Sequence, residues 1–381
     1  VRLADDSILD HATTLLAALR IGMPMEAIDT TGWLYLPERL AQVLQRLGAL
    51  DRRNKPHPEH TREFLEAPRP DALLLLAQTW RYSPDLNDLR QLPGLVFEGD
   101  WQYNPLQARN AIIDWLRQVP PGQWWHLNAF INHIYTQQPD FQRTAGDYEA
   151  WSIRRQSDNT YLRGFADWQE VDGALIRHIL TVSLPAFGLV DLATDAAGHP
   201  WTAFRVSQWG DTILQDVPPQ GLPEERGKLK VTSEGEIIVQ PGFPRAMRYQ
   251  VARFCHWLEA REGSYRYLVT PASLEKATHQ GLRPAQLVSL LKRSAAGPVP
   301  PTLLKALERL DKFGVQVSVQ TTSILRVATP EMLSALRTSR ASRYIGESLN
   351  LTTATIKPGG AKELRRVIAE MGYLGHFELD G

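Results

Sequence analysis

The sequence contains a single cysteine, Cys255, among its 381 residues. One cysteine cannot form an intramolecular disulfide, and it excludes a cysteine-rich zinc site. A chain without disulfides suits a reducing compartment, so we expect a cytoplasmic protein. No uninterrupted run of about 18 apolar residues occurs, and we therefore predict no membrane-spanning helix. The first residues also lack the charge and apolar order of a signal peptide.

Motifs of catalytic and metal sites are missing as well. The sequence has no G-x-x-x-x-G-K-[ST] loop for nucleotide phosphates, no G-x-S-x-G nucleophile elbow and no H-E-x-x-H pair among its ten histidines. Cys255 follows Phe254 in an apolar stretch, which is typical of a buried and unreactive thiol. These absences predict a protein that is not an enzyme and that holds no metal or other cofactor.

What the chain does have is an uneven distribution of charge. Residues 1–227 carry 20 Lys and Arg against 29 Asp and Glu, whereas residues 228–381 carry 22 against 13. The formal net charges are therefore −9 and +9, although the whole chain is neutral. A basic domain favours a polyanionic partner because binding releases counterions. Two alternatives stay open: the two parts attract each other, or both charged surfaces are simply solvated.

The pattern of residues 1–216 is mainly helical. We predict helices near 8–19, 37–47, 71–80, 105–119, 127–135 and 172–187, followed by a β-hairpin over 188–214. Three helices and a hairpin are the order of a winged-helix domain, which we assign to 101–216. Residues 1–100 form a helical unit for which a second winged-helix-like arrangement is left open. The third helix offers only Arg177 and His178 for reading DNA bases, so we favour packing against protein over DNA reading.

Residues 217–228 are rich in proline and glycine and are predicted to be a linker. After them the pattern indicates a compact α+β domain over 229–381, so the predicted fold class is α+β. It begins with a hairpin that turns at Ser233–Gly235. A helix follows, with Met247, Val251, Phe254 and Leu258 on one face. Further helices begin at Thr-Pro pairs, where the threonine hydroxyl can cap the helix and proline fits its first turn.

This C-terminal region resembles a known family over residues 229–374. The resemblance rests on three stretches: GEIIVQPGFPRAMRYQVARFCHWLE, YLVTPASLEKATHQGLRPAQLVSLLKRSAAGPVPPTLLKALERL, and SILRVATPEMLSAL with TTATIKPGGAKELRRVIAEMGYL. They are similar to the helicase-associated domain at the N-terminus of XPB-type helicases, and to the module of a TFIIH subunit that docks XPB. The N-terminal half is more loosely similar to segments that precede this domain in bacterial helicase-associated proteins. The resemblance implies work beside a DNA-translocating motor.

Basic side chains on helix surfaces are the candidates for DNA contact. We expect a break near Thr338, with Ser339 capping a second helix whose Ala341, Ile345 and Leu349 face inward. In the last helix we expect Leu364, Val367, Ile368 and Met371 to face inward. The outward basic residues form the candidate site: Lys292, Arg293, Arg340, Arg343, Lys357, Lys362, Arg365 and Arg366. Lys292 and Arg293 could instead complement the dipole of their helix.

We therefore hypothesise a helicase-associated protein that contacts DNA phosphates largely without sequence preference. A different hypothesis is a docking module, or clutch, that recruits or regulates a separate helicase or nuclease. A third is that the chain is the N-terminal part of a truncated helicase. Trp124, Trp125 and Trp151 could stack on unpaired bases, although most tryptophans belong to protein cores.

Overall fold

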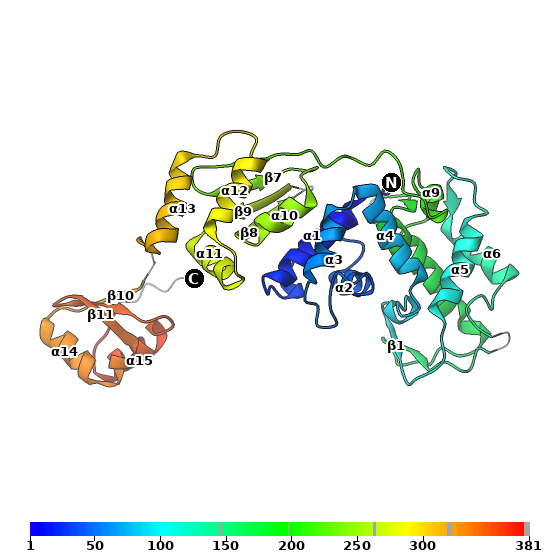
Figure 1. The fold of residues 1–381 in the computed structure, drawn as a ribbon. Coiled ribbons are helices and arrows are strands. Elements are labelled where there is room, and N and C mark those ends of the chain that lie inside the picture. Colours follow the sequence, from blue (N-terminus) through cyan, green and yellow to red (C-terminus); the bar gives the residue numbers. More distant parts are fainter. Residues whose placement is uncertain (145–146, 197, 262–263, 318–321, 377–381) are drawn as a thin grey trace. The chain divides into compact units, whose positions relative to one another are not determined.

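The structure is a computed structural model that describes residues 1–144, 147–196, 198–261, 264–317 and 322–376. It has the predicted α+β fold class, with helices and small antiparallel sheets (Figure 1). The chain divides into two compact units, Val1–Lys312 and Phe313–Gly381. This division differs from the boundary that we predicted, because residues 217–228 and the elements that follow them to Lys312 belong to the first unit.

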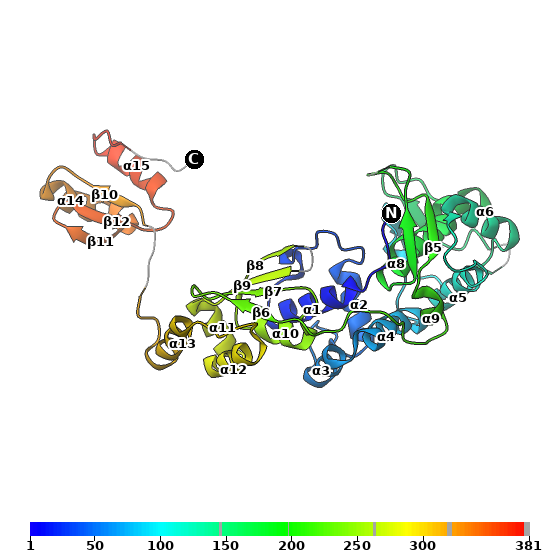
Figure 2. The ribbon, with the colours of Figure 1, turned by 90° about the horizontal axis from the view of Figure 1, so that it is seen from above.

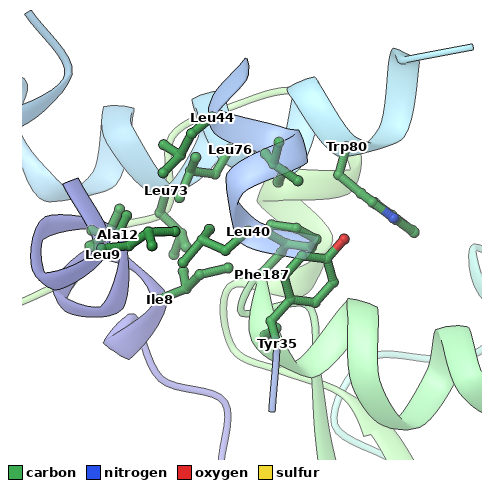
Figure 3. Close-up of a cluster of buried hydrophobic side chains, with 14 of the residues drawn as sticks. Ile8, Leu9, Ala12, Tyr35, Leu40, Leu44, Leu73, Leu76, Trp80 and Phe187 are labelled. Carbon is green, nitrogen blue, oxygen red and sulfur yellow. The ribbon is translucent and has the colours of Figure 1, made fainter. Parts of the chain in front are cut away.

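The first unit begins with helices that share one core. They are α1 (Ser7–Arg20), the 3₁₀ turn η1 (Met25–Ala27), α2 (Pro37–Arg46), α3 (Pro58–Glu66) and α4 (Arg69–Tyr82). Leucines of α1, α2 and α4 point toward one another in Figure 3, and Phe187 joins them from a later part of the chain. Proline starts α2 and α3, where its missing N–H is not needed for an intrahelical hydrogen bond.

The middle of the first unit has the predicted order of three helices and a hairpin. Its elements are η2 (Leu89–Gln91), β1 (Leu95–Phe97), α5 (Pro105–Leu116), β2 (Trp125–His126), α6 (Leu127–Gln137), β3 (Ile153–Arg155), η3 (Phe165–Asp167), β4 (Val190–Ala193), β5 (Ala203–Val206) and α9 (Gly210–Leu214). The third helix alternates π and α turns as η4 (Gln169–Gly173), α7 (Ala174–His178), η5 (Ile179–Ser183) and α8 (Leu184–Ala186). Strand β5 pairs with β4 and β2, and β1 pairs with β3, all antiparallel.

The last part of the first unit is a four-stranded sheet with helices. It contains β6 (Leu229–Val231), β7 (Glu236–Val239), α10 (Arg245–Ala252), β8 (His256–Arg261), β9 (Ser264–Leu268), α11 (Pro271–His279), α12 (Pro284–Ser294) and α13 (Pro301–Phe313). The sheet order is β6-β7-β9-β8. The predicted hairpin and the Thr270-Pro271 helix start are confirmed, since β6 pairs with β7 and the Thr270 hydroxyl accepts from the N–H of Ser273.

One helix prediction in this part is wrong. The helix that we extended to Leu258 ends at Ala252, and residues 256–261 form β8 instead. Leu258, predicted to face inward, is 45% exposed. Trp257 points to the other side, where its ring packs edge-on against Tyr267 of β9. Pairing of β8 with β9 therefore overrides an apolar spacing that also fits a helix.

The second unit has its own small core. Its elements are β10 (Ile324–Arg326), α14 (Pro330–Thr338), the 3₁₀ segment η6 (Arg340–Tyr344), β11 (Ile345–Asn350), β12 (Thr353–Ile356) and α15 (Ala361–Glu370). The sheet order is β10-β12-β11, and Figure 2 shows α14 and α15 beside it. The buried residues are Leu325, Leu333, Leu336, Ala341, Ile345, Ala354, Leu364, Val367 and Ile368. The Leu325 and Ala354 pair is buried while Ile324 is exposed, so the helices cover one face of the sheet.

The predicted break in this unit is confirmed, but the helix after it is short. The Ser339 hydroxyl accepts from the N–H of Ala341 at 3.1 Å, as a helix cap should. Only the segment η6 follows, and Ile345 already begins β11. Ala341 and Ile345 are buried as predicted, whereas Leu349 is 55% exposed and was wrongly placed inward. Ile345 and Leu349 lie on a strand whose register with β12 shifts between Ile345 and Ser348 and again between Ser348 and Asn350, so neither helical spacing nor regular strand alternation relates the two side chains.

Candidate nucleic-acid interface

The structure places the eight candidate DNA-contacting residues in two separate sets. Lys292 and Arg293 are exposed at the end of α12, in the first unit. The other six, Arg340, Arg343, Lys357, Lys362, Arg365 and Arg366, are exposed in the second unit. Most of the candidate site therefore lies in the second unit, within one small fold.

The start of α15 brings three of these residues together. The backbone N–H of Lys357 donates to the carbonyl of Tyr344 at 2.9 Å, which ties the loop before α15 to the end of η6. A Cβ at Gly360 would lie 3.1 Å from the Cβ of Tyr344, so the loop approaches η6 as closely as glycine allows. Lys357 in this loop, Arg343 beside Tyr344 and Lys362 in the first turn of α15 are therefore neighbours in the fold, next to the N-terminus of α15. We call these three side chains the α15 cluster.

Helix α15 has the predicted two faces. Leu364, Val367 and Ile368 are buried, and Lys362, Arg365 and Arg366 are exposed. Arg366 lies 3.4 Å from Glu363 and 3.6 Å from Glu370 in exposed ion pairs, so its charge is partly balanced by its own helix. The N-cap of α15 is Gly360, whose missing side chain leaves the first N–H groups without a side-chain cap. These N–H groups and the helix dipole add positive potential beside the α15 cluster.

The neighbouring segment η6 adds further arginines. The guanidinium of Arg343 lies over the ring of Tyr344, 4.8 Å from its centroid. Arg340 is exposed on the same segment. Our sequence analysis missed Arg337, which is exposed and donates to the carbonyl of Gly346 at 2.7 Å. Its position three residues before Arg340 is a sequence signal that could have included Arg337 among the candidate DNA-contacting residues.

Several other arginines of the basic C-terminal part are not on the surface. Arg245 is fully buried and its Nε donates to Glu225 at 2.6 Å. Arg248 is 2% exposed and donates to the carbonyl of Asp10 at 2.6 Å.

Arg69 of α4 lies among the same carboxylates. It bridges Asp6, Asp10 and Glu225 at 2.6, 2.9 and 3.2 Å. Burial opposes its charge, but its contacts with Asp6 and Asp10 raise the pKa of Arg69 above its usual value.

These contacts explain why residues 229–312 share a unit with the N-terminal helices. Helix α10 packs against α1 and α3, and the acidic residues that meet Arg245 and Arg248 precede residue 228. The open alternative that the two oppositely charged parts attract each other therefore holds for these arginines. Only part of the +9 surplus is left for an external partner.

The third helix of the N-terminal part does not present both of its candidate base-reading residues. His178 is 7% exposed, and its Nε2 lies 2.9 Å from Nη1 of Arg39. Burial, followed by the positive charge of Arg39, lowers the pKa of His178 to about 4, so the ring is neutral. Arg177 is exposed and hydrogen-bonds Asn128. His178 is thus a packing residue, and naming it as a base reader is corrected.

The tryptophans considered for base stacking differ in exposure. Trp151 is buried between the ring of Trp101, 4.9 Å between centroids, and the guanidinium of Arg143 at 3.9 Å. Both faces are occupied, so Trp151 cannot stack on a base. Trp124 and Trp125 are 41% and 38% exposed, and Arg205 lies over the ring of Trp124.

Other candidate chemistry can be located in the described part of the chain. Cys255 is buried, and burial raises the pKa of its thiol, which keeps it protonated. No group of three or more His, Cys, Asp or Glu side chains suited to a metal occurs among the residues that the structure describes. Of the helices within the described ranges, none combines the length and apolar character needed to cross a bilayer.

A comparison with protein families finds one relevant match. Residues 229–349, about a third of the chain, match a family model described as helicase conserved C-terminal domain. No curated protein matches the chain. The matched segment includes the sheet β6-β7-β9-β8, helices α10 to α14, and nearly all of β11, whereas α15 lies beyond it. The chain therefore contains a segment similar to a helicase C-terminal domain, which supports a helicase-associated role.

Proposed function

We propose that this protein is a helicase-associated DNA-binding protein whose second unit contacts the phosphate backbone. The observation that carries the proposal is the α15 cluster, in which Arg343, Lys357 and Lys362 belong to segments that meet beside the uncapped N-terminus of α15. These side chains are exposed, while the apolar residues of the same elements are buried. Cationic side chains near uncapped backbone N–H groups suit phosphate oxygens and carry no information about base sequence.

We further propose that the protein acts by binding and not by catalysis. The sequence holds no phosphate-cradling loop for ATP, and the similar segment belongs to a helicase family model. A motor supplied by another polypeptide would then do the translocation. This extends the resemblance to XPB-type helicase-associated domains, in which the accessory domain works beside a motor.

The test is fluorescence anisotropy of labelled single-stranded, forked and duplex DNA with the full chain. One phosphate contact for each of the three cations of the α15 cluster predicts that affinity falls about fortyfold between 50 and 200 mM salt. The double variant R343E/K362E should weaken binding at least tenfold and lower the salt slope by about two, one for each lost contact. A matched control is K305E/R309E, which makes the same charge change on exposed residues of α13. Equal weakening by both variants, or tight binding by R343E/K362E, would contradict the proposal.

A second candidate function is the docking of a separate helicase or nuclease. Exposed apolar residues of the second unit support it: Ile324 of β10, Leu349 of β11 and Leu351 in the turn after β11 are 53%, 55% and 78% exposed. Apolar residues grouped on a small unit are typical of protein interaction sites. The chain would then act as a clutch, as its resemblance to the XPB-docking module implies.

Affinity purification from native cells separates the two functions. If docking is correct, a helicase or nuclease should co-purify with the wild-type chain and with R343E/K362E, but not with I324D/L351D. Co-purification that survives DNase treatment would exclude a DNA tether. The docking function fails if no motor or nuclease is recovered with the wild-type chain.

A further inference from the structure

A pocket in the first unit lies between helices that belong to distant parts of the sequence. It is formed by the end of α1 with α3, α10 and α12, and its volume is about 490 Å³. Cavities of this size accommodate small organic ligands. Part of its wall, α10 and α12, lies in the segment that matches the helicase family model, and part lies in the N-terminal helices.

The pocket gathers positive charge. Four arginines line it: Arg20, Arg62, Arg253 and Arg293. Glu66 is the one acidic side chain among the described residues of its wall, and it faces Arg62 at 4.0 Å. Three guanidinium groups are therefore left without a carboxylate of the pocket wall. Cations that share one cavity repel each other, and an anionic ligand would relieve this repulsion.

Arg253 has a side-chain donor in the pocket wall that lacks a hydrogen-bond acceptor in the part of the chain that the structure describes. Its Nη1 donates to the side-chain carbonyl of Gln250 at 3.0 Å, but its Nε is buried and has no hydrogen-bond partner within the described residues. A buried donor without an acceptor is unfavourable. Burial lowers the pKa of Arg253, and the charge of Arg20 lowers it further, while Tyr249 opposes both. An anionic oxygen near Nε would satisfy the donor and stabilise the charge.

The rest of the wall is apolar with two amides. Leu65 and Leu290 are buried, Leu282 is half-buried, and all three line the pocket. Gln250 and Gln286 present amide groups at its edge. A ligand that fits this wall has an anionic end, a flat or apolar body and polar edges. Carboxylate and phosphate both match forked guanidinium donors, and the greater charge of phosphate suits several arginines around one ligand.

We propose that this pocket binds a nucleotide, with its phosphate on Arg253, Arg20 and Arg293 and its base or sugar against Leu65, Leu282 and Leu290. The nucleotide is either free or one unit of a nucleic-acid strand. The site is distinct from the α15 cluster, so it can fail or succeed independently of the proposed DNA contact in the second unit. A bound nucleotide would join the N-terminal helices to the helicase-like segment.

Isothermal titration calorimetry of the full chain tests the proposal with three probes: adenosine monophosphate, inorganic pyrophosphate and a six-nucleotide thymidine strand. Adenosine monophosphate should bind at one saturable site, more tightly than pyrophosphate. R253Q should weaken it at least tenfold, and R253K, which keeps the charge but loses the fork, should weaken it less. R309Q removes the same charge from an exposed position on α13 and should leave affinity within twofold.

Each outcome decides the proposal. Competition between the thymidine strand and adenosine monophosphate supports it with nucleic acid as the source, and binding of adenosine monophosphate without competition supports a free nucleotide. The proposal is overturned if adenosine monophosphate shows no saturable binding, binds no more tightly than pyrophosphate, or is weakened equally by R253Q and R309Q. Tryptophan-fluorescence unfolding of R253Q, compared with the wild type, checks that the variant is folded.

Discussion

Several arginines of the first unit are buried in ion pairs and hydrogen bonds, whereas those of the basic second unit lie on its surface. Arg69, Arg245 and Arg248 in the first unit are buried and meet carboxylates or backbone carbonyls from other segments. Arg340 and Arg343 in the second unit are exposed. A buried guanidinium requires partners, since its desolvation is otherwise not compensated. The comparison shows that the number of arginines in a region does not predict how strongly it binds DNA, because only the exposed arginines can contact DNA.

The largest effect expected from this comparison is on the stability of the first unit. Arg69→Ala leaves Asp6 without its cation, while Asp10 and Glu225 keep Arg248 and Arg245, and removing one partner of a buried ion pair costs about 3–5 kcal/mol. Urea unfolding, followed by tryptophan fluorescence, measures this change in the free energy of unfolding. All 11 tryptophans lie between Trp33 and Trp257, so the fluorescence reports only on the first unit.

The control is an arginine whose ion pair is exposed. Arg46 lies 2.7 Å from Asp85, and both side chains are 51% exposed. Arg46→Ala should change the free energy of unfolding by less than about 1 kcal/mol, because solvent screens such pairs. If the two alanine variants were equally stable, the distinction between buried and exposed arginines would not hold in this protein.

A smaller effect is expected from pH, again in the first unit. His178 has a pKa of about 4 in the folded chain, below its unfolded value of about 6.5, because it is buried. Between these two values the unfolded chain binds the proton and the folded chain does not. Stability is therefore present above about pH 6.5 and is lost as the pH falls toward 4, by about 2 kcal/mol between pH 7 and pH 5.

His178→Gln removes the titrating group and keeps a side chain that can accept from Arg39. Carboxylates and other histidines contribute equally to both proteins, so the difference between their stability curves isolates His178. We expect the variant to lose less stability than the wild type between pH 7 and pH 5, measured by urea unfolding at each pH. Parallel curves would mean that His178 has the same pKa in the folded and unfolded chain, which would contradict its burial as the cause of a lowered pKa.

The contrast between buried and exposed arginines also marks the limit of what could be predicted from sequence. Helices with a strong apolar face or a proline start, such as α2, α4 and α15, were expected and found. Helix α3 was missed because it follows a polar, proline-containing stretch. Strand β8 was mistaken for helix, since its pairing with β9 is not visible in local spacing. The partner of Arg248 lies 238 residues away in sequence, so nothing near Arg248 distinguishes it from Arg343.

In the candidate site, too, features that depend on helical periodicity were predicted, whereas contacts between segments far apart in sequence were not. The outward direction of Lys362, Arg365 and Arg366 follows from the helical period of α15 and was predicted. The approach of Lys357 to Tyr344 was not predicted, because it depends on a backbone hydrogen bond between two elements that are not adjacent in sequence. The pocket around Arg253 joins four helices and likewise has no local pattern.

The smallest expected effect concerns one motif, the Thr-Pro helix start, which occurs in both units. Helices α11 and α14 both begin with Thr-Pro. Thr270 accepts from the N–H of Ser273 at 3.0 Å, and the Ser273 hydroxyl accepts from the N–H of Thr270 at 3.0 Å, which completes a reciprocal capping box. Thr329 accepts from the N–H of Met332 at 3.3 Å, but the methionine side chain at position 332 has no oxygen to return the bond. The cap of α11 thus satisfies one more backbone donor than the cap of α14.

We therefore expect Thr270→Ala to lower the free energy of unfolding of the first unit by about 1 kcal/mol, and Thr329→Ala to lower that of the second by about half as much. Tryptophan fluorescence measures the first value, and amide signals of β11 and β12 in NMR spectra measure the second. Serine at either position keeps the hydroxyl and should restore most of the loss. A larger loss for Thr329→Ala would mean that the surroundings of each cap, and not its hydrogen bonds, set its contribution.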